Sequence, residues 1–219
     1  SVMQNEPGLV NLMGGEAACA DKLDALFTAT PAMRPGTYGR PIHEMVEMAA
    51  INMGQYAHGN EPVHHVLYLY DYVGQPWKTQ VHLRQTMNWL YQAAPDGLCG
   101  DEDTGQMSAW YVFSALGFYP VCPGDPNYLI GSPVFDKATL NLPGGKKFTI
   151  TTTHNGPQEF YIHGGKLNGA SFDKTYISHQ QITDGGELEF EMGSAPNFKW
   201  GVSDRPASPM ATLQSADGK

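Results

Sequence analysis

The spacing of apolar residues changes once along the chain, near residue 120, and this change limits the folds that the chain can adopt. Before it, segments such as 15–27, 41–57 and 75–94 repeat apolar residues every three or four positions, which predicts helices. After it, segments such as KFTITTT and ELEFEM alternate polar and apolar residues between Gly-rich turns, which predicts short strands. We therefore expect an α+β fold in which a helical portion precedes a small antiparallel β-rich region.

The same patterns suggest boundaries within the chain. We expect a helical part over residues 1–122, a β-rich part over 123–202 and a flexible tail over 203–219, where small and polar residues dominate. Residues 105–118 are apolar nearly all round, which predicts an interior helix. Because several of the helices are apolar on more than one face, they are expected to belong to a larger helical assembly.

Charge and hydropathy exclude several classes of protein. The 219 residues carry 13 Lys and Arg against 22 Asp and Glu, a net charge of −9, and no basic cluster, which argues against binding to nucleic acid or to an acidic membrane surface. No apolar run is long enough to span a bilayer. The cysteines Cys19, Cys99 and Cys122 form no CxxC pair and allow one disulfide at most.

A first polar cluster, HGNEPVHH, lies at residues 58–65. Asn60 and Glu61 offer the hard oxygen ligands that Ca²⁺ prefers, whereas zinc would favour imidazole or thiolate. The alternative is structural: Glu61 and Pro62 begin a helix, while His64 and His65 pack or face solvent. A zinc hydrolase that uses His43, His64 and His65 is disfavoured because their spacing fits no standard zinc pattern.

A second cluster, GDEDTGQ at residues 100–106, places Asp101, Glu102 and Asp103 directly before an apolar helix. Three adjacent carboxylates repel one another, which is energetically costly unless a bound cation offsets the repulsion or a function requires them. Extended or loop geometry would turn Asp101 and Asp103 to the same side. The alternative is that Asp103 is the N-cap of the helix and its neighbours favour the helix dipole.

Two further sites are weaker candidates. His43 and Glu44 are adjacent on a predicted helix, where neighbouring side chains diverge, so a surface residue and a satisfied histidine are the structural alternative. HEMVE resembles a zinc-protease helix but has Glu47 where the second histidine is required. Trp77 could form an edge for stacking against a sugar, or it could belong to the core.

Taken together, these motifs resemble glycoside hydrolase family 92, which contains calcium-dependent exo-acting α-mannosidases. The resemblance rests on GLVNLMGG (8–15), IHEM (42–45), GNEPVHH (59–65), GQPWKTQ (74–80), PDGLCGDEDTGQMSAWYVFSALGFYPV (95–121), YLIGSPVFDKATLNLPGGKKFTI (128–150) and MGSAPNFKWG (192–201). It implies an N-terminal β-sandwich followed by an (α/α)6 barrel, of which this chain matches only the C-terminal part. The rest of the barrel and the sandwich would then be its structural partners.

The resemblance also implies a chemistry and its residues. Family members hydrolyse terminal α-mannosides with inversion, which requires one carboxylic acid and one carboxylate base. By motif position Asp103 matches the general base, with Asp101 supporting it, and the general acid is expected upstream of Ser1. Asn60 and Glu61 match calcium ligands.

On the leaving-group side of the sugar, His43 and Glu44 match residues of members selective for α-1,2 linkages. The family also suggests mannose-containing glycans as substrates and the periplasm or exterior of a bacterium as the location. The alternative function is a carbohydrate-binding or structural module, in which the β-rich residues 128–202 pack against a partner domain and catalyse nothing.

Overall fold

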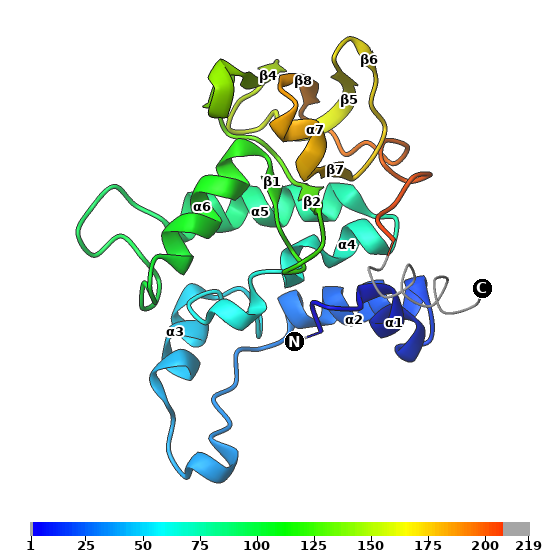
Figure 1. Cartoon of the computed structure of the whole chain (residues 1–219). Coiled ribbons are helices and arrows are strands. Elements are labelled where there is room, and N and C mark those ends of the chain that lie inside the picture. The colour runs from blue at the N-terminus through cyan, green and yellow to red at the C-terminus, as the bar shows by residue number, and fades with distance from the viewer. Residues whose placement is uncertain (1, 208–219) are drawn as a thin grey trace.

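The computed structural model describes residues 2–207, in which six α-helices precede the first strand along the chain. In Figure 1, α1, α2 and α3 lie at the bottom, α5 and α6 lie in the middle at the level of β1 and β2, and strands β4, β8, β5 and β6 lie at the top. The change from helices to strands occurs at Phe118, which confirms a mixed α and β architecture.

The helical part contains six α-helices and three 3₁₀ turns. The helices are α1 (Glu6–Leu12), α2 (Glu16–Thr28), α3 (His43–Ile51), α4 (Leu69–Tyr72), α5 (Pro76–Leu90) and α6 (Gln106–Leu116), and the 3₁₀ turns are Gly36–Tyr38, Glu61–Val63 and Val66–Tyr68. Pro76 occupies the first turn of α5, where its missing N–H costs little. Asn52, with a φ of 53°, ends α3 earlier than the apolar pattern suggested.

Helix α6 is less enclosed than its composition predicted. A single stripe is buried, formed by Met107, Trp110, Ser114 and Ala115, whereas Val112 is 55% exposed. The prediction of an interior helix is therefore wrong for one face of α6. Composition alone could not reveal this, because it does not say which neighbours the chain provides for each face.

The β-rich part consists of two sheets. A three-stranded antiparallel sheet has the order β1 (Phe118–Tyr119), β2 (Asn127–Ile130), β7 (Tyr176–Ser178). The second sheet has five strands in the order β3 (Lys137–Asn141), β4 (Lys147–Thr153), β8 (Gly186–Gly193), β5 (Tyr161–Leu167), β6 (Ala170–Ser171).

The expectation of a purely antiparallel region is wrong for one pair of strands. Strands β4 and β8 run parallel, with Phe148 opposite Gly186 and Thr153 opposite Glu191. Parallel neighbours need a long crossover, and the chain provides one by passing through β5, β6, β7 and α7 (His179–Thr183) between them. The five-stranded sheet is therefore mixed.

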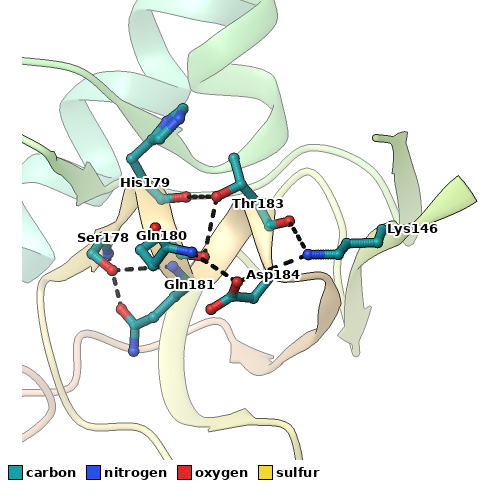
Figure 2. A network of polar contacts seen from close by, with 7 residues as sticks. All are labelled: Lys146, Ser178, His179, Gln180, Gln181, Thr183 and Asp184. Carbon is teal, nitrogen blue, oxygen red and sulfur yellow. Dashed lines mark hydrogen bonds and ion pairs between the residues drawn. The ribbon is translucent and has the colours of Figure 1, made fainter. Parts of the chain in front are cut away.

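Helix α7 closes this crossover and is held at both ends (Figure 2). The Ser178 hydroxyl accepts a hydrogen bond from the Gln181 N–H at 3.1 Å, and the Gln181 side chain accepts from the Ser178 N–H at 2.9 Å, which is a capping box. At the other end, Lys146 Nζ donates to the Thr183 carbonyl at 3.4 Å. The network fixes the turn that leads into β8.

Helix α5 joins the helical part to the sheets through polar side chains. Gln80 accepts a hydrogen bond from the Ile162 N–H at 3.1 Å, and Arg84 Nε donates to the Ser132 hydroxyl at 2.9 Å. Arg84 is buried and also donates to Asn155 and to the Pro133 carbonyl. Because these groups are removed from water, the bonds fix how the two parts sit together.

The first residues of the predicted tail make specific contacts. Asp204 forms an ion pair with Lys174 at 2.8 Å, and Arg205 forms one with Glu16 at 2.8 Å. Residues 208–219 of that tail lie outside the described residues. The three cysteines are all free, and none of the helices within residues 2–207 is long and apolar enough to cross a membrane.

Candidate active site

The two acidic loops meet at a pair of glycines. A Cβ atom on Gly100 would lie 2.6 Å from the Gly59 Cα and 2.6 Å from its carbonyl oxygen. A Cβ on Gly59 would lie 2.9 Å from the Cys99 carbonyl oxygen and 2.9 Å from Glu47 Oε2. Only glycine allows two backbones to approach this closely. The glycines of the two motifs therefore bring GNEP and GDED together.

This contact places Glu61 beside the second acidic loop. The pKa of Glu61 is raised, first by burial and then by the neighbouring Asp103 and Asp101 carboxylates. Glu61 Oε1 is also buried without a hydrogen-bond partner among the described residues. A cation here would relieve both the repulsion and the unpaired oxygen.

The backbone before α6 is unusual at three consecutive residues. Asp103, Thr104 and Gly105 have φ values of 47°, 58° and 89°. Two consecutive non-glycine residues in the left-handed region carry a strain that is typical of functional sites. Because Gly105 is the N-cap of α6 and makes no side-chain cap bond, the alternative role of Asp103 as N-cap is wrong.

Glu102 caps the helix in place of Asp103. Its two carboxylate oxygens accept hydrogen bonds from the Ser108 N–H at 2.9 Å and from the Ser108 hydroxyl at 2.5 Å. These bonds with Ser108 lower the pKa of Glu102. The middle carboxylate of the cluster thus stabilises α6, while both flanking carboxylates act electrostatically on Glu61. That Asp101 and Asp103 turn to the same side stays a prediction.

Glu61 and Asp103 line one cavity of about 430 Å³. The same cavity is lined by His64, His65 and Gln106, and by Tyr119 at the start of the first sheet. A concave site with convergent carboxylates is the usual form of a small-molecule binding site.

His64 forms the polar floor of this cavity and is held as a neutral ring. His64 Nε2 lies 3.0 Å from the His58 carbonyl oxygen and therefore donates to it, and His64 Nδ1 accepts from Gln106 Nε2 at 3.2 Å. Burial lowers its pKa to about 4. Because both nitrogens already have protein partners, His64 has no free lone pair for zinc, which argues against the zinc hydrolase.

His65 is also buried, and burial lowers its pKa to about 4. Behind both residues, the ring of His58 bonds the hydroxyls of Tyr56 and Tyr91, at 2.7 and 2.8 Å. Within residues 2–207, no group of three or more His, Cys, Asp or Glu side chains is arranged to hold a metal.

His43 and Glu44 begin α3 on the side of the site that carries Asp101. His43 Nδ1 lies 3.0 Å from Glu47 Oε1, and His43 Nε2 lies 3.4 Å from Glu44 Oε1. The bond to Glu47 raises the pKa of His43, and the charges of Glu44, Glu47 and Asp101 act in the same direction. The structure thus places His43 within the electrostatic influence of Asp101 on the acidic loop.

Trp77 is placed elsewhere. It lies in the first turn of α5 and packs edge-on against Phe198, with ring centroids 4.9 Å apart. It is absent from the residues that line the cavity of Glu61 and Asp103. Its role as a sugar-stacking residue stays a prediction.

Several residues of the site were not identified from the sequence. Glu47 was noted only as a mismatch to a zinc motif, although its spacing of four residues from His43 on a helix is a recognised signal for a side-chain pair. Gln106 joins His64 to the Tyr119 hydroxyl, to which it donates at 3.0 Å. No local pattern identifies such a contact, because its partners are far apart in sequence.

The residues that could hold calcium have the right donor chemistry. Asn60 and Glu61 supply neighbouring oxygen donors, and Glu61 has a buried oxygen without a partner among the described residues. Ca²⁺ binds six to eight oxygen atoms, roughly, and accepts water or sugar hydroxyls among them. These residues therefore fit an oxygen-rich cation site that is left open toward the cavity.

Comparison with known proteins places this site in a family. Residues 1–194 match the family model for the glycosyl hydrolase family 92 catalytic domain. An inverting mannosidase of family GH92 from Bacteroides thetaiotaomicron is 53% identical, with a TM-score of 0.80 over 94% of this chain and 28% of its own. An α-mannosidase of family GH92 from the same organism, solved with mannoimidazole, is 35% identical, with a TM-score of 0.82 over 99% of this chain and 29% of its own.

A secreted glycosidase of Arthroderma benhamiae is more distant. It is 28% identical over 154 residues, which are 69% of this chain and 20% of that protein. The chain thus spans less than a third of the length of each of these relatives.

Proposed function

Because the chain belongs to glycosyl hydrolase family 92, we propose that the full-length protein containing it is a calcium-dependent, inverting exo-α-mannosidase. The observation that carries this proposal is the convergence of Glu61, Asp101 and Asp103 at the Gly59–Gly100 contact. In the full-length protein the helices would complete an (α/α)6 barrel beside an N-terminal β-sandwich. The similarity to secreted and bacterial glycosidases supports a location outside the cytoplasm.

In this proposal Asp103 is the general base. Its carboxylate accepts a proton from a water molecule as that water attacks the anomeric carbon of a terminal mannose. Asp101 supports it by keeping the site negative. Asp103 lines the cavity and is not the N-cap of α6, which leaves its carboxylate available for this role. The general acid, which protonates the leaving oxygen, is expected from a segment that precedes GLVNLMGG in the full-length protein.

Asn60 and Glu61 would hold the calcium ion. When bound, Ca²⁺ supplies a positive charge that can orient and polarise hydroxyl groups of the sugar. His43 and Glu44 would contact the sugar on the leaving-group side, which favours α-1,2-linked mannosides. Trp77 remains a candidate for stacking at a more distant part of the glycan.

The test is the substitution Asp103→Asn in the full-length protein, assayed on an α-1,2-linked mannoside with and without a chelator. Loss of a general base lowers turnover by about 10²- to 10⁴-fold. We expect a loss of that size for Asp103→Asn, and a loss of activity in the chelated wild type that added Ca²⁺ restores. Near-normal turnover of the variant would refute the assignment of the base. A wild type that binds mannose oligosaccharides without turnover would instead support the carbohydrate-binding module.

A further inference from the structure

Glu47 connects the predicted substrate contacts on α3 to the acidic loops. One of its oxygens, Oε1, lies 3.0 Å from His43 Nδ1, one turn away on the same helix. The other, Oε2, is buried beside Gly59, the first residue of the GNEP motif. The Glu47 side chain is 25% exposed, whereas that of His43 is 61% exposed. The more buried side chain therefore holds the more exposed one in place.

The contact also determines which nitrogen of His43 carries the hydrogen. A carboxylate only accepts hydrogen bonds, so His43 Nδ1 must be the donor to Glu47. In the neutral ring the lone pair is then on Nε2, which lies 3.4 Å from Glu44 Oε1, and a sugar hydroxyl that binds at this edge of the ring can donate a hydrogen bond to it. Besides Glu47, the charged groups that act on the ring are Glu44 on the same helix and Asp101 on the loop before α6.

We propose that Glu47 is a positioning residue for the leaving-group side of the substrate. Its carboxylate holds His43 through Nδ1 and presents Nε2 to a hydroxyl group of the second sugar. The inference rests on the proposed function, because it takes His43 as a substrate contact. It predicts that Glu47 affects substrates whose leaving group is a sugar and spares those whose leaving group is not.

A double-mutant cycle in the full-length protein tests this proposal, with Glu47→Leu, His43→Ala and the combined variant. The substrates are α-1,2-mannobiose and 4-nitrophenyl α-mannoside. Loss of a group that orients a ligand-binding histidine costs about tenfold or more. We expect Glu47→Leu to lower kcat/KM for mannobiose by about tenfold, mainly through KM, and for the aryl mannoside by less than about twofold.

The combined variant should be no worse than His43→Ala alone, because Glu47 acts through that ring. Equal losses on both substrates, or an additional tenfold loss in the combined variant, would overturn the proposal. Glu47→Gln should lose less than Glu47→Leu, since an amide oxygen can still accept from Nδ1. Glu191→Gln, a substitution on the exposed side of β8, is the matched control and should leave both substrates unchanged.

Nitrogen-15 NMR of the histidine rings separates this inference from the proposed function. We expect His43 to carry its hydrogen on Nδ1 in the wild type and to lose that preference in Glu47→Leu. An unchanged ring would overturn the positioning role even if the protein is an active mannosidase. An inactive wild type would refute the proposed function and the substrate role of Glu47 together, whereas the ring signals would still report on the Glu47–His43 contact.

Discussion

The helical part and the sheets bury different kinds of residue. The core of the sheets is apolar, and its buried polar residues are hydroxyl-bearing, such as Ser132, Thr152 and Thr175. The helical part also buries titratable groups, among them Glu6, Asp71, His58, His64 and His65. Because burying such groups costs stability, their concentration in the helical part is in line with the proposed location of the active site there.

The largest difference between the two parts should appear in the free energy of unfolding that is lost when a buried residue of each part is substituted. His58→Leu removes the partner of the buried Tyr56 hydroxyl and one partner of the half-buried Tyr91 hydroxyl, and it should lower the free energy of unfolding by about 2–4 kcal/mol. Phe148→Leu, in the apolar core of the sheets, replaces one hydrophobic side chain by another and should cost less, about 1.5 kcal/mol. Urea denaturation of both variants measures this difference, and a larger loss for Phe148→Leu would contradict it.

Acidification should also destabilise the helical part more than the sheets. The folded protein keeps His64 and His65 neutral with pKa values of about 4, while the unfolded chain binds protons below about pH 6.5. Protonation therefore favours unfolding, and stability should fall as the pH decreases from 6.5 to 4. The histidines of the sheets, at positions 154, 163 and 179, are exposed.

Glu6 opposes this trend. Burial raises its pKa to about 7, so its contribution to stability is greatest below the unfolded value and is lost as the pH rises through 7. Burial raises the pKa of Asp71 and of Glu61 in the same direction. The histidines whose pKa burial lowers outnumber these three carboxyl groups, so the net loss on acidification should remain; they are His58, His64, His65 and His82. Hydrogen exchange at pH 7 and pH 4.5 would measure it. We expect α5 and α6 to lose protection before β4 and β8, and the reverse order would refute this view.

The smallest effect should come from a single methyl group at the contact between the loops. Gly100→Ala places a Cβ 2.6 Å from the Gly59 backbone, so the loops must separate. We expect the proposed mannosidase activity of the full-length protein to fall about tenfold, as when a catalytic geometry shifts slightly. Gly164→Ala in β5 is the matched control, because its Cβ would meet only Glu191 Oε2, at 3.9 Å. Equal activity of the two variants would show that the contact between the loops is not needed.

Much of the fold could be predicted from local patterns. The predicted helix over 75–94 corresponds to α5 (Pro76–Leu90), because Pro76 and the apolar stripe are local signals. The alternating segments became strands for the same reason. The parallel pairing of β4 with β8 could not be predicted, since alternation gives the face of each residue but does not identify the neighbouring strand.

The candidate site, like the fold, could be predicted from the sequence only in part. The sequence identified Asn60, Glu61, Asp101 and Asp103 as unusual, because carboxylates crowded around glycines need an explanation. It left open whether Asp103 caps α6, and only the structure shows that Glu102 does so instead. The contact of Glu47 with His43 was accessible from the spacing of four residues, but its anchorage beside Gly59 was not.

The sequence by itself determined the order of helices and strands, the acidic character of the two loops and the family to which the chain belongs. These properties depend on residues that are close together along the chain. The tertiary structure alone decided that the two loops meet, that Asp103 is free of the helix cap and that the histidines beside them are neutral. Each of these depends on distance and on exclusion of water, which arise only when segments far apart in sequence are packed together.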